Sequence, residues 1–178
     1  LCSPWFSRLC KIVMRIFIVG YMLSGKSTIG KRLARLLNYK FIDTDKAIEQ
    51  QYKLSVSDIF KKYGEEVFRT LEKQMINTLK EEENIVISTG GGFVCFNDNM
   101  KWVKENGISI YLKLTPEAII SRHKVAKRPR PLLQNKTDEE LLNFIKQTLK
   151  EREVYYQQSD FIFNALSVKP EEIIKIIL

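Results

Sequence analysis

The sequence predicts an α/β protein organised as a three-layer sandwich, in which helices cover both faces of a central, mostly five-stranded parallel sheet. Short β-branched runs alternate along the chain with segments whose apolar residues recur at helical spacing, and no internal repeat is present. This alternating order favours parallel strands joined by helices. A glycine-rich turn directly after the first expected strand agrees with this fold, because such sheets bind ligands beyond the carboxyl ends of their strands.

Individual elements follow from local patterns. The expected strands are short runs of β-branched and aromatic residues, at 15–19, 39–42, 85–88, 108–112 and 161–163. The expected helices occupy 29–37, a stretch from about 46, 55–63, 65–79, 97–104, 116–124, 137–157 and a closing stretch from 170. Gly64 is expected to end the third helix, and Thr137 with Glu140 forms a capping-box pattern.

Length and composition indicate one ordinary globular domain. The chain has 178 residues, of which 44% are hydrophobic and 28% are charged. We expect residues 14–178 to form a single domain with a lid around 122–137, and residues 1–13 to be an N-terminal extension outside the fold. No apolar run approaches the roughly 20 residues that span a bilayer. Three cysteines form neither a metal quartet nor an even disulfide set, so we expect a cytoplasmic protein with reduced thiols.

The net charge of +8 raises the question of a nucleic-acid partner. Basic residues are densest at 122–130, where three arginines occur. Arginine clusters of this kind suit the phosphates of a small molecule as well as those of a polynucleotide. No signature of an RNA- or DNA-binding module accompanies the cluster. We therefore expect no nucleic-acid partner and no membrane partner.

The segment Gly20–Thr28, here called the phosphate loop, matches the pattern G-x-x-x-x-G-K-[ST] at every fixed position. It lies between an expected buried strand and an expected helix, where backbone N–H groups and the helix N-terminus converge on phosphate oxygens. Lys26 is expected to reach the β- and γ-phosphates of ATP, and the Ser27 hydroxyl to ligate Mg²⁺. The remaining expected ATP contacts in this loop are Gly20, Ser24, Gly25 and Thr28. A glycine turn that merely joins strand to helix is the alternative.

Two further motifs follow expected strands. Asp43 and Asp45 follow the second strand, and Gly90-Gly91-Gly92 follows the third. In a parallel sheet the carboxyl ends of the strands lie at one edge, so both motifs should meet the phosphate loop in one crevice. Helix capping by the aspartates, or a flexible turn at the glycines, is the simpler interpretation of each motif alone.

Taken together, these motifs resemble those of the shikimate kinases, a family of small phosphate-loop kinases. The resemblance runs from Met14 to the C-terminus. The matching segments are the phosphate loop, Phe41–Asp45 with Ile48-Glu49, Phe68-Arg69-x-x-Glu72, Gly90–Gly92, Arg130–Leu133 and Arg152-x-x-x-Tyr156. The resemblance implies transfer of the γ-phosphoryl group of ATP to the 3-hydroxyl of shikimate, with Mg²⁺ as cofactor. It also implies a role in making chorismate and aromatic amino acids, and we expect a monomer.

The family's substrate-binding residues carry over onto specific positions. Arg69 and Arg152 match the arginines that bind the carboxylate of shikimate, although Arg152 could equally belong to an exposed i, i+4 charge ladder. Phe60 and Phe68 resemble the aromatic wall of the ring pocket, and core residues would look identical in sequence. The glycines Gly90, Gly91 and Gly92 match the segment that touches shikimate near the γ-phosphate, where small residues let backbone amides approach a ligand.

The resemblance also assigns the catalytic and metal-binding residues. Asp45 matches the aspartate that orients the attacking hydroxyl or takes its proton. Asp43 matches an aspartate near Mg²⁺, which it would reach through water. Arg130 is expected to stabilise charge on the transferring phosphoryl group when the lid closes.

Two further residues are expected near the nucleotide, and a third position departs from the family pattern. Arg122 would lie at the base of the lid near the adenine or the phosphates, and Pro170 resembles a proline of the adenine loop. Leu23 stands where many members of the family have glycine. If this position requires positive φ, leucine would be strained there and nucleotide affinity would suffer.

Two other functions are consistent with parts of the pattern. Another small-metabolite kinase with a phosphate loop, such as a gluconate or nucleotide kinase, would share Gly20–Thr28. A nucleotide kinase, however, would not need Phe68-Arg69-x-x-Glu72 together with a triple glycine. A non-catalytic module that binds nucleotide or nucleic acid through the basic lid is the alternative from a different class.

Overall fold

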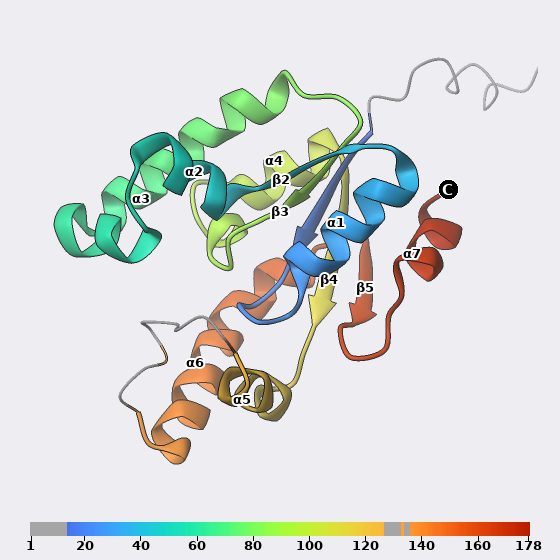
Figure 1. Cartoon of the computed structure of the whole chain (residues 1–178). Helices are drawn as coiled ribbons and strands as arrows, with labels where there is room; N and C mark the ends of the chain where they lie inside the picture. Colours follow the sequence, from blue (N-terminus) through green and yellow to red (C-terminus); the bar gives the residue numbers. More distant parts are fainter. Residues whose placement is uncertain (1–13, 127–132, 134–135) are drawn as a thin grey trace, which may run out of the picture.

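A five-stranded sheet with helices on both faces forms the protein (Figure 1), in a computed structural model that describes residues 14–126, 133 and 136–178. The strands are β1 (Arg15–Val19), β2 (Lys40–Asp43), β3 (Ile85–Ser88), β4 (Ile108–Lys113) and β5 (Phe161–Asn164). The helices are α1 (Lys26–Leu37), α2 (Thr44–Tyr52), α3 (Val56–Lys80), η2 (Phe93–Cys95, a 3-10 helix), α4 (Asn99–Asn106), α5 (Pro116–Lys124), α6 (Asp138–Tyr156) and α7 (Pro170–Ile177).

All neighbouring strands of the sheet are parallel, in the order β2-β3-β1-β4-β5, which confirms the predicted fold class. The central strand β1 therefore leads directly into the phosphate loop. Ser88 of β3 lies in register with Ile18 of β1 on one side and with Asp43 of β2 on the other. The ends of these three strands consequently reach the same edge of the sheet, where ligands of this fold class bind.

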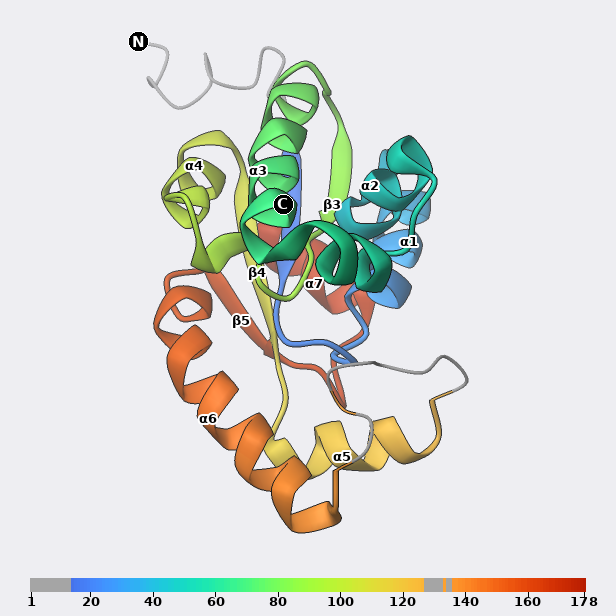
Figure 2. The same ribbon diagram turned by 90° about the vertical axis from the view of Figure 1, so that its left-hand side faces the viewer.

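Alternating residues of β1 divide the core into two layers. Ile16 and Ile18 pack into a cluster that includes residues of α1, α5, α6 and α7, whereas Phe17 and Val19 pack with residues of α2, α3 and α4. This is the two-residue period expected of a strand buried on both faces. A view turned by 90° shows α5 and α6 side by side beyond the ends of β4 and β5 (Figure 2).

Helix α3 bends at Gly64, where the backbone has φ 83° and ψ 173°. The predicted division into two helices at this glycine is confirmed, although the hydrogen-bond pattern runs on across the bend. Ser55 caps the first half by accepting a hydrogen bond from the Asp58 amide. The bend places the second half, with its regularly spaced apolar residues, against the sheet while the first half turns toward α2 (Figure 1).

One expectation about the segment after the glycines was wrong, and one element there was not predicted. The η2 turn was not anticipated, and α4 begins at Asn99 rather than at residue 97. Asn97 and Asp98 both have positive φ, 55° and 56°, so neither can be part of a right-handed helix. The capping box at Thr137 and Glu140 is confirmed, with both of its hydrogen bonds formed.

The expected lid lies only partly within the described residues, and the expected extension lies wholly outside them. Residues 1–13, and with them the expected extension, lie outside the described residues, as do 127–132 and 134–135 of the lid. Leu133 is buried in the cluster that contains Ile119 of α5 and Leu141 of α6. Within the described ranges, no helix combines the length and apolar character needed to cross a bilayer.

The end of α2 provides a test of the backbone geometry. Lys53 terminates this helix in a left-handed conformation, with φ 55°. Replacement of Lys53 by glycine should raise the free energy of unfolding by about 0.5–1 kcal/mol, because glycine adopts this conformation without a steric penalty. The same replacement at Lys146, exposed within α6, should lower it by about 1 kcal/mol. Urea unfolding measures both changes, and losses at both positions would contradict the assigned geometry.

Candidate functional site

The phosphate loop curls around the side chain of its own lysine. The Lys26 ammonium donates hydrogen bonds to the carbonyl oxygens of Gly20 and Tyr21, at 2.8 and 2.7 Å, and is almost fully buried. Gly20 and Gly25 have φ of 142° and 90°, which only glycine adopts without strain. Within the described part of the chain, no side chain caps the start of α1 at Gly25, so the positive end of the helix dipole is directed into the loop. The loop therefore has the geometry of an anion-binding turn.

The other loop residues surround this turn. Ser24 is buried and lies 3.5 Å from the Lys26 ammonium through its hydroxyl, whereas Thr28 is exposed in the first turn of α1. Leu23 has a positive φ of 65°, so leucine is strained at this position, as expected from the sequence for a positive φ. A left-handed residue with a Cβ costs about 1–2 kcal/mol. Arg122 supports the strained residue, because its guanidinium donates to the Leu23 carbonyl at 2.9 Å.

Three oxygen-bearing side chains meet beside the start of α1. The Ser27 hydroxyl donates to Asp43 at 2.5 Å and lies 3.3 Å from the Ser88 hydroxyl. Their proximity follows from the sheet, since Asp43 and Ser88 are neighbours in register. Asp43 also caps α2 by accepting from the Lys46 amide, so its capping and its contact with Ser27 coexist. A hydroxyl and a carboxylate next to a phosphate-binding turn form a donor set that suits Mg²⁺.

The triple glycine approaches the second aspartate motif closely. The Gly90 amide donates to the Thr44 hydroxyl at 2.8 Å. A Cβ built on Gly90 would lie 2.3 Å from a carboxylate oxygen of Asp45, a distance that no side chain could occupy. The Asp45 carboxylate therefore lies directly against this backbone, and any residue larger than glycine would displace it.

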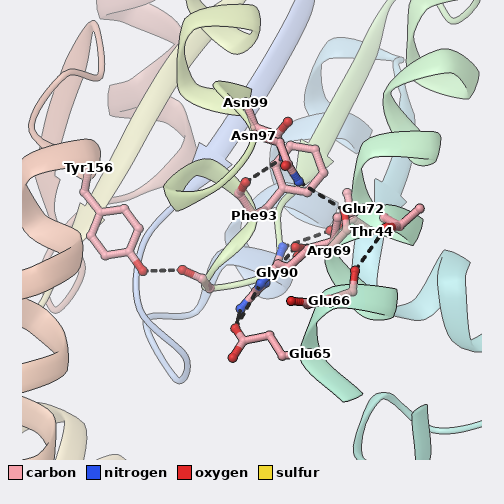
Figure 3. A network of polar contacts seen from close by, with 12 residues as sticks. Thr44, Glu65, Glu66, Arg69, Glu72, Gly90, Phe93, Asn97, Asn99 and Tyr156 are labelled. Atoms are coloured by element: carbon pink, nitrogen blue, oxygen red, sulfur yellow. Dashed lines mark hydrogen bonds and ion pairs between the residues drawn. The ribbon is translucent and has the colours of Figure 1, made fainter. Parts of the chain in front are cut away.

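Arg69 reaches the same glycine segment from α3. A Cβ on Gly92 would lie 2.7 and 2.8 Å from the two terminal nitrogens of its guanidinium. The guanidinium is held by ion pairs with Glu72 at 2.6 Å and Glu65 at 2.7 Å (Figure 3). Its carbon also lies 3.9 Å from the centroid of the Phe96 ring. Arg69 is thus fixed in orientation at the glycines.

Arg152 approaches the middle glycine from α6. A Cβ on Gly91 would lie 3.4 Å from a guanidinium nitrogen of Arg152 and 3.5 Å from the amide nitrogen of Met22 in the phosphate loop. The Tyr156 hydroxyl, one helical turn further along α6, donates to the Gly91 carbonyl (Figure 3). Gly90 therefore lies against Asp45, Gly91 against Arg152 and Gly92 against Arg69. Gly91 also lies next to the phosphate loop.

Glu72 is a buried carboxylate within this group. Burial raises its pKa to about 7, Asp45 adds to the rise, and the guanidinium groups of Arg69 and Arg152 oppose it. One of its oxygens pairs with Arg69, while the other has no hydrogen-bond partner among the described residues and faces Gly90. This oxygen and a carboxylate oxygen of Asp45 both lie beside Gly90, at 3.2 and 2.3 Å from a Cβ built there.

Aromatic rings line one side of Arg69. The Phe60 and Phe68 rings pack at 4.8 Å between centroids, with Phe68 buried and Phe60 half-buried. The Arg69 guanidinium carbon lies 5.9 Å from the Phe60 centroid and 5.6 Å from that of Phe68. The two rings are therefore both core residues and neighbours of the cationic group.

Two residues expected near the nucleotide base, Arg122 and Pro170, lie on α5 and α7. Arg122 bridges two segments, donating to the carbonyls of Leu23 and Ala165 at 2.9 Å each. Pro170 is buried at the first position of α7, five residues after Ala165. Arg122 thus acts as a structural link between the loop and the segment that precedes α7. Arg130, expected on the lid, lies outside the described residues.

Some residues of the site carried no recognisable signal in the sequence. Phe96 stacks on Arg69 from the irregular segment after η2, and a lone aromatic residue there has no distinguishing pattern. Ser88 and Thr44 are the neighbours of recognised motifs, and only the register of β2 and β3 brings their hydroxyls to Ser27 and Gly90. Glu65 pairs with Arg69 four residues later, a spacing that sequence inspection could have singled out.

Comparisons with known proteins agree with this geometry. A family model described as shikimate kinase matches residues 22–178. The shikimate kinase of Bacteroides thetaiotaomicron is 46% identical over 153 residues, covering 86% of this chain and 87% of the relative. A crystal structure of shikimate kinase from that organism superposes with a TM-score of 0.86 at 42% identity, covering 92% and 96% of the two chains.

A second similar solved structure is described as a complex with a ligand. The shikimate kinase from Acinetobacter baumannii, described as a complex with shikimate, has a TM-score of 0.82 at 30% identity and covers 96% of this chain and 94% of its own. The match of the family model over most of the chain, together with relatives well above 30% identity, is sufficient to assign membership. The chain therefore belongs to the shikimate kinase family.

Proposed function

We propose that this protein transfers the γ-phosphoryl group of ATP to the 3-hydroxyl of shikimate, a step toward chorismate and the aromatic amino acids. The observation that carries the proposal is the packing of Gly90–Gly92, which gathers Asp45, Arg152 and Arg69 around one segment and joins them to the phosphate loop. A small acid with hydroxyl groups matches these neighbours. Its carboxylate suits two guanidinium groups, and its hydroxyls suit a carboxylate.

The proposed phosphate contacts come from the loop and the start of α1. Lys26 and the backbone amides of this turn bind the phosphates, with Gly20, Ser24, Gly25 and Thr28 shaping the turn. Ser27 and, through water, Asp43 would hold Mg²⁺, which would neutralise charge on the phosphate oxygens. The support for this assignment is the pairing of Ser27 with Asp43 beside the lysine-centred loop.

The proposed acceptor contacts come from α2, α3, α6 and the glycines. Asp45 orients the attacking hydroxyl and accepts its proton, while Arg69 and Arg152 bind the carboxylate. Phe60 and Phe68 cover one side of the ring. Positioning and charge stabilisation account for most of the catalysis in such a reaction, since the phosphoryl group needs little covalent assistance.

The lid completes the proposal. We assign Arg130 the role of stabilising charge on the transferring group, and the segment 122–137 the role of excluding water when it closes. Arg122 anchors the start of this segment to the phosphate loop. Pro170 is assigned to the adenine side, within one domain of residues 14–178 that functions as a monomer.

The test is a coupled ADP-release assay with shikimate, gluconate and nucleoside monophosphates as separate acceptors. We expect release to depend on shikimate alone. Release with gluconate or a nucleoside monophosphate, but not with shikimate, would replace the proposal by one of the other kinase functions. No acceptor-dependent release, combined with polynucleotide binding that weakens steeply with salt, would support a non-catalytic module.

Replacement of Asp45 by asparagine tests the proposed catalytic carboxylate. The substitution keeps the shape of the side chain against Gly90 but removes its charge and basicity, so kcat should fall by about 100-fold or more. The affinity for ATP, measured by equilibrium binding, should change little. Asp98→Asn removes the same charge from an exposed position and should leave kcat near wild type. An unchanged kcat for Asp45→Asn would remove this residue from the mechanism.

Replacement of Arg69 by lysine tests the proposed carboxylate contact. Lysine keeps the charge but lacks the planar fork that binds a carboxylate through two hydrogen bonds. We expect KM for shikimate to rise by about tenfold, while KM for ATP stays near wild type. Arg32→Lys on the exposed face of α1 is the matched control. An equal rise in both KM values would indicate a general loss of structure instead.

A further inference from the structure

Glu65 occupies the edge of Arg69 that a bound carboxylate would use. One of its carboxylate oxygens accepts hydrogen bonds from both Nε and Nη2 of Arg69, at 3.1 and 2.7 Å (Figure 3). A guanidinium group binds carboxylates through two parallel N–H groups, and this pair of nitrogens is one of its two such edges. Within the free protein, Glu65 thus makes the contact that an acidic ligand seeks.

The second edge of the guanidinium also includes a nitrogen that is bonded to Glu65. It consists of Nη1 and Nη2, which lie so close to the Gly92 backbone that a Cβ there would be only 2.7 and 2.8 Å from them. Nη1 is bonded to Glu72 at 2.6 Å, and Nη2 is the nitrogen bonded to Glu65. Both edges include Nη2, so a carboxylate that binds Arg69 in bidentate fashion must share this nitrogen with Glu65 or displace it.

The two glutamates that contact Arg69 differ in burial. The Glu72 side chain is 1% exposed, whereas that of Glu65 is 55% exposed. An exposed ion pair is screened by water and contributes little stability, so the Glu65 contact is the weaker one and the easier to break. Glu72 and the stacked Phe96 ring hold the guanidinium in place from other directions. Arg69 therefore keeps its orientation when Glu65 moves away.

We propose that the Glu65 carboxylate competes with the carboxylate of the substrate for Arg69 and thereby weakens the binding of shikimate. This inference rests on the proposed function and adds a residue that sets its substrate affinity. Glu65 follows the bend at Gly64, and its side chain is 55% exposed, so it can swing toward solvent. The substrate carboxylate then replaces the glutamate, and Arg69 exchanges one anionic partner for another.

Replacement of Glu65 by glutamine tests the competition. Glutamine has the same shape without the charge, so KM for shikimate should fall by about two- to fivefold, the range expected for an exposed ion pair. The kcat and the KM for ATP should stay near wild type. Glu66→Gln is the matched control, because Glu66 is exposed on the same turn and, among the described residues, its side chain has no hydrogen bond, while its backbone carbonyl accepts one from the Thr70 hydroxyl. It should leave KM for shikimate within about 1.5-fold of wild type, since distant exposed charges are screened.

A substrate analogue separates competition for the carboxylate from a general change in the site. The methyl ester of shikimate lacks the anionic group, so Glu65→Gln should not improve its binding, measured by calorimetry beside that of shikimate. One result would overturn the inference but not the proposed function. In it, the wild type releases ADP in a shikimate-dependent manner, but the KM of Glu65→Gln for shikimate is equal to or above that of the wild type. An equal gain for shikimate and its ester would also overturn it. Wild-type ADP release that does not depend on shikimate would overturn the proposed function, and the inference with it.

Discussion

The candidate site depends on three consecutive residues without side chains. Gly90, Gly91 and Gly92 follow β3 and pass so close to Asp45, Arg152 and Arg69 that a Cβ on the first or third would overlap its neighbour. The strand order places β3 between β1 and β2, so this backbone runs between the phosphate loop and the aspartate motif. Groups from α2, α3, α6 and the phosphate loop thereby lie around the same three residues. An alanine at Gly92 would force the Arg69 guanidinium away from the position that its ion pairs define.

Charge compensation governs the behaviour of this space. The charge of Arg69 is balanced by two carboxylates. Glu72 is buried, and desolvation raises its pKa to about 7. Glu65 is exposed, and its side chain can leave Arg69 for solvent. A fixed partner maintains the orientation of the cation, while a mobile one can give way to an incoming anion. The Lys26 ammonium is likewise held by carbonyl oxygens of its own loop. Both cations are therefore held in position by the protein itself in the free structure.

Local patterns predicted the fold and most of the candidate site. The strands, the bend at Gly64, the capping box at Thr137 and the lysine-containing loop depend on interactions within a few residues, and the structure has each of them. The start of α4 could not be predicted, because the left-handed conformations of Asn97 and Asp98 follow from how the chain leaves η2. Phe96 could not be identified either, since its contact with Arg69 joins residues from separate elements.

By itself, the sequence determined the chemistry that is available: a phosphate-binding turn, an acidic pair, paired arginines and a backbone free of side chains, in an order typical of one kinase family. Only the tertiary structure decided which of these groups touch and which are already paired. The register of β2 with β3 brought Asp43 and Ser88 to Ser27, and the packing of α3 and α6 beside the glycines brought Arg69 to Gly92 and Arg152 to Gly91. Spacing along a chain specifies neighbours within one helix or strand, whereas contacts between elements depend on how the whole core packs.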